Sequence, residues 1–409
     1  MEKKRPSGRL WIAAVLVVII VAGAAAAAYY YTSTTAPTTP VTTIAPPATT
    51  PLTTVVTTVP AATTGVTTIT APATTPPTTA VTTVPATTSV TAPVTTPVGR
   101  KYKMAVMLGG DETDAGFSYM AIQGAYTIRD KYGWEIDISR TIPYVDGPRV
   151  ARDYAHRAYD LVWAQGGQFQ DQIYGVAPTF PNTYFVQVPG WETPPPNTAA
   201  LGPAFQVNGH YLAGVLAGKM TKTNAVGCIY GAWLPYLSME FWAFKAGVES
   251  VNPSAKVYAR VTGAWGDASL GYQIAKSLIQ TKHVDIIVQI ADLTGRGIIR
   301  ACQEFGIMVI GTVADQSVLA PEATLTSIMM DTPGFMEMIV QSIMDGTFKD
   351  KFAGKLVDVD ISSLAPFHNF EQAVPQEVKD LLKQTDDAIK NGTIVVPRTV
   401  TEAPPRDPT

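Results

Sequence analysis

The segment Met104-Ala-Val-Met-Leu108, followed by Gly109-Gly-Asp-Glu-Thr-Asp-Ala-Gly-Phe-Ser118, decides the fold. The first five residues are all apolar, which is typical of a strand buried on both faces. The next ten residues are rich in Gly and Asp, as loops are. Residues Tyr119–Tyr132 then read as a helix. The sequence therefore predicts a strand, a loop and a helix in immediate succession.

The same alternation recurs along the chain. Strands that alternate with helices of about 10–15 residues predict a parallel sheet and an α/β fold. About 310 residues remain beyond the first hundred, which is enough for two lobes of ordinary domain size. The further predicted strands are 159–164, 184–188, 226–230, 257–261, 285–290 and 308–310, and the helices are 170–177, 239–251, 269–281 and 297–305.

Five loops that follow predicted strands are rich in Gly, Asp, Gln and aromatic residues. Ligands of open α/β sheets bind beyond the carboxyl ends of the strands, so these loops are the predicted site. They are GGDETDAGF (109–117), AQGGQFQD (164–171), GAWGD (263–267), ADLTG (291–295) and GTVADQ (311–316).

The N-terminal region predicts where the protein works. Leu10–Tyr31 is an uncharged, mostly apolar run, long enough as a helix to cross a bilayer of about 30 Å. Basic residues precede this run, so we expect a cytoplasmic flank (1–9), a transmembrane anchor (10–31) and an extracytoplasmic remainder. The alternative is a cleaved signal peptide, which the small residues Gly23–Ala28 would permit. The basic residues are Lys3, Lys4, Arg5 and Arg9.

Residues 32–98 consist almost wholly of Thr, Pro, Ala and Val. Such a segment cannot bury enough apolar surface to fold, so it predicts a disordered stalk at the cell surface. The density of Thr and Pro favours O-glycosylation, and a passive spacer without sugars is the alternative.

Composition excludes several classes of function. With a net charge of -3 and no basic cluster beyond the flank, the chain is not expected to bind nucleic acid. We expect no metal, no cofactor and no enzymatic activity, because the sequence lacks HExxH, CxxC, GxSxG and Walker motifs. Cys228 and Cys302 are predicted to be buried free thiols, with a disulfide as the alternative.

The loops and their neighbours carry a resemblance to a known family. Residues 164–190, 210–231, 263–279, 291–297 and 309–316 are together similar to the basic membrane protein (BMP) family. Its members are extracytoplasmic solute-binding proteins of ABC importers, and characterised members bind purine nucleosides. The resemblance spans Lys101–Pro397, and YLAGVLAGKMTKT (211–223) is its most specific piece.

The resemblance implies two doubly wound parallel-sheet lobes with a ligand cleft between them, as in type I periplasmic binding proteins. On this basis we expect lobe 1 to comprise 99–205 and 324–350, and lobe 2 to comprise 206–323 and 351–397. Residues 398–409 are predicted to be a disordered tail.

The resemblance also implies site residues. The family clamps a base between two aromatic rings, which correspond here to Phe117 and Trp265. Asp171 is the candidate for reading a purine edge. The other matching positions are Asp114, Ser118 (where the family usually has Asn) and Asp267.

Each of these residues also has a structural interpretation. Phe117 is equally suited to a core position at a helix start, and Trp265 to packing beneath a loop. Asp114 and Asp267 precede predicted helices, where Asp commonly caps free N–H groups. Asp171 is compatible with a solvated helix surface.

Three positions depart from the family pattern. Asp292 stands where the family has Gly, Val313 replaces an Asp and leaves only Asp315, and Met330 replaces a Lys. The family's Asp and Lys would hydrogen-bond pentose hydroxyls. Asp292 is therefore the candidate that compensates, or the ligand is not a nucleoside.

The sequence thus predicts a monomeric solute-binding protein that captures a small molecule, with a purine nucleoside favoured, and delivers it to ABC permease subunits. Ligand binding would shift an open–closed equilibrium of the lobes. The alternative is the ectodomain of a sensor for a different small metabolite.

Overall fold

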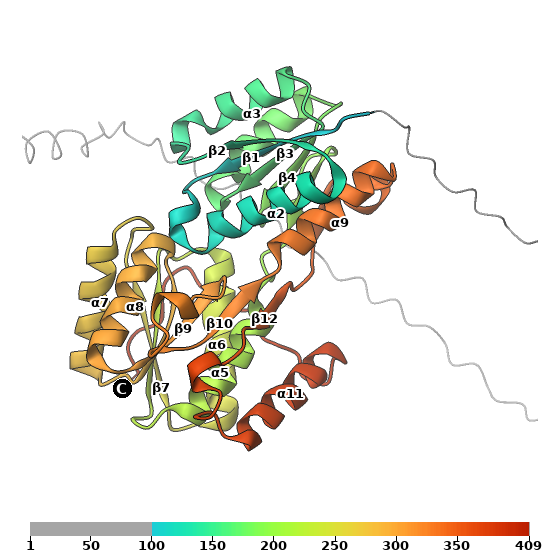
Figure 1. Cartoon of the computed structure of the whole chain (residues 1–409). Helices are drawn as coiled ribbons and strands as arrows, with labels where there is room; N and C mark the ends of the chain where they lie inside the picture. The colour runs from blue at the N-terminus through green and yellow to red at the C-terminus, as the bar shows by residue number, and fades with distance from the viewer. Residues whose placement is uncertain (1–99, 409) are drawn as a thin grey trace, which may run out of the picture. The chain divides into compact units, whose positions relative to one another are not determined.

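A computed structural model describes residues 100–408 of the chain (Figure 1). This part contains two six-stranded sheets, each covered by helices. The predicted flank (1–9), anchor (10–31) and stalk (32–98) lie outside the described residues. Among the helices between residues 100 and 408, none has the length and apolar character required to cross a bilayer.

The first sheet has the strand order β11-β5-β4-β3-β1-β2, and every pair is parallel. Together with its helices, this sheet is called lobe 1. The strands are β1 (Lys103–Leu108), β2 (Glu135–Ser139), β3 (Leu161–Gln165), β4 (Tyr184–Val188), β5 (Thr198–Leu201) and β11 (Lys355–Val357). The helices are α2 (Phe117–Tyr132), α3 (Gly147–His156), α4 (Gln170–Val176), α9 (Thr332–Met344) and α10 (Phe348–Lys351).

Strand β1 shows why its sequence is apolar throughout. Met104, Val106 and Leu108 share one apolar cluster with α2 and α9. Ala105 and Met107 belong to another cluster with α3 and α4. Since side chains alternate between the faces of a strand, helices cover both faces of this sheet.

The second sheet, with its helices, is called lobe 2. Its order is β12-β10-β9-β8-β6-β7, with only β12 antiparallel to its neighbour. The strands are β6 (Ala225–Tyr230), β7 (Lys256–Val261), β8 (Ile286–Ile290), β9 (Met308–Val313), β10 (Thr324–Met330) and β12 (Ser362–Leu364). The helices are α5 (Val207–Met220), α6 (Pro235–Val251), α7 (Ala268–Lys282), α8 (Asp292–Phe305) and α11 (Gln376–Lys390).

Helices α5 and α6 approach each other at two reciprocal glycines. A Cβ atom at Gly214 would lie 2.1 Å from the carbonyl oxygen of Phe244, and one at Gly247 would lie 2.1 Å from that of Tyr211. Each helix thus packs against bare backbone of the other. No side chain fits at either position without moving one helix.

Three short segments connect the lobes and lie side by side. Phe205 in the first segment accepts a hydrogen bond from Ile361 N in the third (2.9 Å). Ile361 O in turn accepts one from Asp331 N in the second segment (2.9 Å). The connections are therefore residues 202–206, residue 331 and residues 358–361.

The lobe boundaries differ from those expected from the sequence. Residues 324–350 were assigned to lobe 1, but β10 pairs with β9 and β12 in lobe 2. Residues 351–397 were assigned to lobe 2, but β11 pairs with β5 in lobe 1. The strand pairings move the second crossing to Asp331 and the third to residues 358–361.

The chain after Pro397 also differs from the sequence prediction of a disordered tail. In the structure it contacts α6, where Thr401 N donates a hydrogen bond to Ser238 Oγ (2.8 Å). Farther along, Asp407 pairs with Arg260 of β7 and Lys282 of α7.

Candidate functional site

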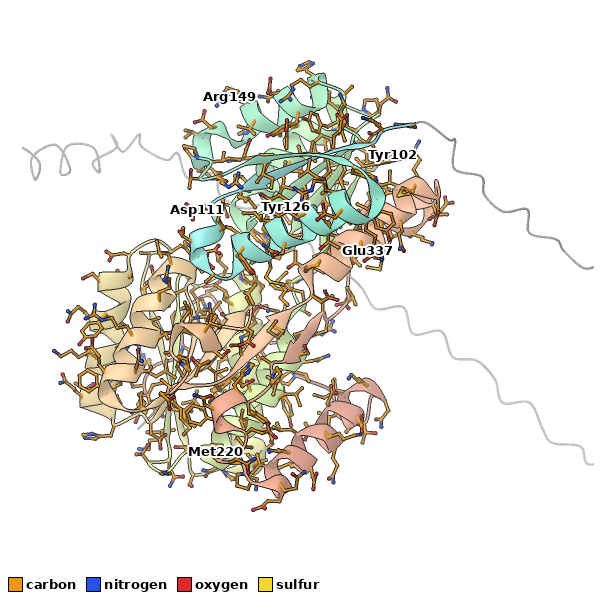
Figure 2. The ribbon with its side chains drawn as sticks, in the orientation of Figure 1. Tyr102, Asp111, Tyr126, Arg149, Met220 and Glu337 are labelled. Atoms are coloured by element: carbon orange, nitrogen blue, oxygen red, sulfur yellow. The ribbon has the colours of Figure 1, made fainter. Side chains whose placement is uncertain are left out.

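The strand order locates the candidate site in each lobe. Both sheets contain the order 2-1-3-4-5, as β2-β1-β3-β4-β5 and β7-β6-β8-β9-β10. In each sheet the chain first adds a strand on one side of the starting strand (β2 beside β1, β7 beside β6) and then adds the next strands on its other side. Ligands of such sheets bind beyond the carboxyl ends of the strands at the point where the order reverses. The relevant loops follow β1 (109–116), β3 (166–169), β6 (231–234) and β8 (residue 291). Figure 2 labels Asp111, near the start of the loop after β1.

Loops of the two lobes contact each other at this position. Gln316 Nε2 of lobe 2 donates to Ala115 O of lobe 1 (3.3 Å), and Arg296 Nη1 donates to Thr113 O (3.2 Å). The loops at these strand ends of the two lobes therefore lie next to each other.

Asp114 begins this arrangement as a helix cap. It is 5% exposed, and its Oδ1 accepts hydrogen bonds from Gly116 N (2.9 Å) and Tyr119 N (3.1 Å). Its Oδ2 accepts one from Ser118 N (2.6 Å). Both oxygens thus hold the first turn of α2, as capping aspartates do. Asp114 orients Phe117 and Ser118, and three of the about four acceptor positions of its carboxyl group are used in doing so.

Phe117 and Ser118 are the first two residues of α2. Phe117 is half-buried against the apolar core, and its carbonyl accepts a hydrogen bond from Gln165 Nε2 (3.2 Å) at the end of β3. Ser118 is buried, and its Oγ lies close to Gly110, where a Cβ atom would be 2.9 Å away. Gly110 in the loop after β1 and Gln165 at the end of β3 thus both contact the first two residues of α2.

Trp265 lies against the loop after β6. A Cβ atom at Gly231 would be only 2.4 Å from Cε3 of the indole, so the ring rests directly on the glycine backbone. The Trp265 carbonyl accepts a hydrogen bond from Thr294 N (3.0 Å). Asp267 N donates to Thr294 Oγ1 (2.8 Å), and Asp267 Oδ1 caps α7 through Leu270 N (2.9 Å). These bonds tie the Trp265 loop to the first turn of α8.

Asp292 carries the unpaired carboxyl group of the site. It begins α8 with a φ of 46°, which is unusual for a residue other than glycine. The side chain keeps some exposure, yet none of the described residues donates a hydrogen bond to it or pairs with it as a cation. Burial, together with the nearby Asp114 carboxylate, raises the pKa of Asp292 to about 8. Such a group has acceptor capacity left for a ligand.

The other two predicted acidic residues are placed differently. Asp315 Oδ1 accepts from Ser317 N (3.0 Å), and its Oδ2 lies 2.6 Å from His368 Nε2. Burial would raise the pKa of Asp315, but the bonds from Ser317 and His368 outweigh it and lower that pKa below its usual value. Asp171 is exposed in the first turn of α4, and no described contact joins it to the other predicted residues.

The structure adds two aromatic residues that sequence reasoning did not include. Trp191, after β4, stacks on Tyr236 of α6 with ring centroids 6.4 Å apart and planes 23° apart. A Cβ atom at Gly167 would be 2.9 Å from the Trp191 ring and 3.7 Å from the Tyr236 ring. Both rings thus border the loop after β3, one from each lobe. Their positions just beyond strand ends were the available signal.

Two of the three positions that depart from the expected family pattern carry buried apolar side chains. Val313 is 6% exposed and Met330 is fully buried.

Between residues 100 and 408, no group of three or more His, Cys, Asp or Glu side chains is arranged to hold a metal ion.

Comparisons with known sequences bear on the whole described part. Residues 101–399 match the family described as Bmp, ABC transporter substrate-binding protein PnrA-like. A purine-binding protein of Brucella abortus is 27% identical over 297 residues, covering 72% of this chain and 82% of the relative. A Haloferax volcanii protein, named as a candidate glucose-binding protein of an ABC transporter, is 27% identical over 285 residues, covering 69% and 71%.

Solved structures agree with this fold. A solute-binding protein of an ABC transporter from Aeropyrum pernix has a TM-score of 0.65 at 19% identity, covering 73% of this chain and 94% of its own. One from Conexibacter woesei has a TM-score of 0.60 at 23% identity, covering 73% and 100%. The resemblance noted from the sequence is confirmed, and the family consists of solute-binding proteins and not of enzymes. This chain belongs to the Bmp family of PnrA-like ABC transporter substrate-binding proteins.

Proposed function

We propose that the protein captures a purine nucleoside or a related small metabolite between its two lobes and delivers it to the permease of an ABC importer. The proposal is supported by the positions of Phe117 at the start of α2, Trp265 against the loop after β6 and the unpaired carboxyl group of Asp292 at the start of α8, on strand-end loops of both lobes. Aromatic faces bind a flat heterocycle, and an unpaired carboxyl group can form hydrogen bonds with the polar edge of that heterocycle. The name of the Brucella abortus relative supports the same class of ligand.

The proposed action requires no chemistry on the ligand. A ligand that contacts both lobes stabilises their closed arrangement relative to the open one, and the permease recognises the closed form. Selectivity follows from Asp292, because a ligand without a donor leaves the carboxyl group unpaired when the lobes close around it. We propose that the protein acts as a monomer.

We further propose that the protein acts outside the cell membrane on an anchored stalk. The support is in the sequence: the apolar run 10–31 follows basic residues, and 32–98 has the composition of an extended spacer. As a flexible coil, such a stalk would span about 45 Å. A tether of this kind keeps the binding lobes near the permease.

A sugar is the second candidate ligand. Val313 and Met330 replace the residues that the family pattern provides for a pentose, and the Haloferax volcanii relative is as similar as the Brucella abortus one. In this case the aromatic residues would pack on a sugar face, and Asp292 would accept its hydroxyl hydrogens.

A thermal-shift screen tests these alternatives. The segment Gly99–Thr409 would be melted alone and with guanosine, inosine, adenosine, glucose and amino acids. A ligand that binds only the folded state raises the melting temperature by mass action. A shift with a nucleoside, verified by calorimetry, supports the proposal. A shift with glucose alone replaces it with the sugar alternative.

A further inference from the structure

The C-terminal segment 398–407, most of which lies beyond the family match, contacts α6 and the loop before it, with Thr401 making most of these bonds; Ser238 Oγ also donates to Thr399 O (3.4 Å). The match ends at residue 399, and Thr401 follows it. Thr401 N donates to Ser238 Oγ (2.8 Å), and Trp233 Nε1 donates to Thr401 O (2.8 Å). Trp242 Nε1 donates to Thr401 Oγ1 (3.4 Å). Ser238 is fully buried, so Thr401 supplies a hydrogen-bond partner for a polar side chain in the interior of lobe 2.

Ion pairs hold the segment on either side of Thr401. Arg398 Nη1 donates to both carboxylate oxygens of Asp358 (2.8 and 2.7 Å), and Asp358 lies in the third connection between the lobes. Asp407 accepts from Arg260 (2.6 and 3.1 Å) and pairs with Lys282 (2.9 Å). These partners lower the pKa of Asp407 to about 2, so it is ionised throughout the neutral range.

Trp233 connects this segment to the candidate site. It lies in the loop 231–234 after β6, with its ring edge-on to Tyr230 (centroids 5.6 Å apart) and near Phe241 (5.8 Å). Two residues earlier is Gly231, on whose backbone the Trp265 indole rests. A continuous set of contacts therefore leads from Thr401 through the loop after β6 to the proposed aromatic clamp.

We propose that Arg398–Asp407 is a positioning element of the ligand site, which fixes the loop 231–234 beneath Trp265 through the bond from Trp233 to Thr401. The inference rests on the proposed function, since it assumes that the ligand binds against Trp265. A loop held in its bound conformation loses less entropy on binding, so the segment raises affinity without contacting the ligand.

The experiment compares two shortened forms of the full chain. One ends at Val400 and lacks every contact of Thr401 and Asp407; its matched control ends at Asp407 and keeps them all. Trp233→Phe, in the intact chain, removes only the indole donor and retains a ring. For each form we would measure hydrogen exchange without ligand, and the Kd for guanosine, inosine and adenosine by calorimetry.

We expect faster exchange in residues 231–242 of the Val400 form than of its control, with the strands of lobe 1 unchanged. Its Kd for a nucleoside that binds the intact chain is expected to rise by about tenfold. Trp233→Phe is expected to raise both the exchange rate of residues 231–242 and the Kd. If the Val400 form does not fold, this variant alone tests the inference. General destabilisation would instead speed exchange in lobe 1 as well.

Unchanged exchange in residues 231–242 overturns the inference, and so does faster exchange with an unchanged Kd. If the intact chain binds none of the three nucleosides, the proposed ligand class is wrong, and the exchange comparison still decides whether the segment fixes this loop.

Discussion

The imidazole of His210 and the carboxyl group of Glu240 face each other inside lobe 2, with Nε2 3.6 Å from Oε2. His210 is fully buried and Glu240 is 1% exposed. Burial lowers the pKa of His210 to about 4 and raises the pKa of Glu240 well above its usual value. Burial thus disfavours the charged form of both groups, and His210 Nδ1 lies 2.8 Å from the carbonyl oxygen of Gln206.

Replacing Glu240 with Gln is expected to change how stability depends on pH. Because the folded pKa of Glu240 is raised, its contribution to stability is present below pH 4.5 and is lost as the pH rises. The lowered pKa of His210 acts in the opposite sense, since that contribution is lost as the pH falls below 6.5. Between these values the two slopes, each up to about 1.4 kcal/mol per pH unit, oppose each other in the unmodified protein.

Urea unfolding across this window would measure the change. In Glu240→Gln only the His210 slope remains, so the free energy of unfolding should rise with pH relative to the unmodified protein. Glu249→Gln, a change at an exposed carboxyl of the same helix α6, is the matched control and should leave the profile unaltered. Identical profiles for all three proteins would contradict the raised pKa of Glu240.

Trp265→Ala is expected to abolish ligand binding and leave the fold intact. An aromatic residue that packs on a ligand contributes about 2 kcal/mol or more, so affinity should fall by at least about thirtyfold. Calorimetry measures the affinity, and circular dichroism checks the fold. Trp265→Phe, which keeps a ring on Gly231, should bind more tightly than the alanine variant. An affinity unchanged in Trp265→Ala would remove this residue from the site.

Substitution of Asp292 is expected to affect binding and stability separately. Asp292→Ala removes the free acceptor and should weaken binding by about tenfold. Asp292→Asn tolerates the positive φ and should be the more stable protein at alkaline pH. The folded pKa of Asp292 is raised. Its carboxyl group therefore contributes to the free energy of unfolding below pH 3.8, and this contribution is lost as the pH rises through about 8.

Calorimetry of Asp292→Ala and melting of Asp292→Asn at acidic and alkaline pH would test these expectations. Unaltered affinity in the alanine variant rejects Asp292 as a ligand contact. A melting difference that does not grow with pH rejects its raised pKa.

Asp114→Ala and Asp267→Ala should differ in cost. Asp114 is buried and accepts three backbone hydrogen bonds, so its loss is expected to lower the free energy of unfolding by about 2 kcal/mol. Exposed Asp267 caps α7 through one bond, and its loss should cost about 1 kcal/mol. Denaturant unfolding compares the two directly; equal costs would mean that the extra bonds to Asp114 add nothing.

The sequence predicted the part of the fold that depends on local pattern. The apolar run of β1 and the repeated alternation with helices are properties of neighbouring residues, and the structure confirms the parallel lobes. The partners of β10 and β11 depend instead on pairing between segments far apart in the chain. Short strands at the crossings carry no local signal of which sheet they join, so their assignment required the structure.

The candidate site was predictable to the level of its loops. An Asp before a helix has the same sequence signature whether it caps that helix or binds a ligand. Only the three bonds of Asp114 and the lack of a described partner for Asp292 distinguish these roles. The stacking of Trp191 on Tyr236 joins two lobes, and spacing along the chain does not reveal it.

The reciprocal packing of Gly214 and Gly247 has a mechanical consequence. At these two points the backbones of α5 and α6 touch with no side chain between them, so the helices cannot slide past each other there without collision. A rearrangement on ligand capture is therefore expected to move α5 and α6 together. The three short connections between the lobes are then where we expect the chain to bend when the lobes close.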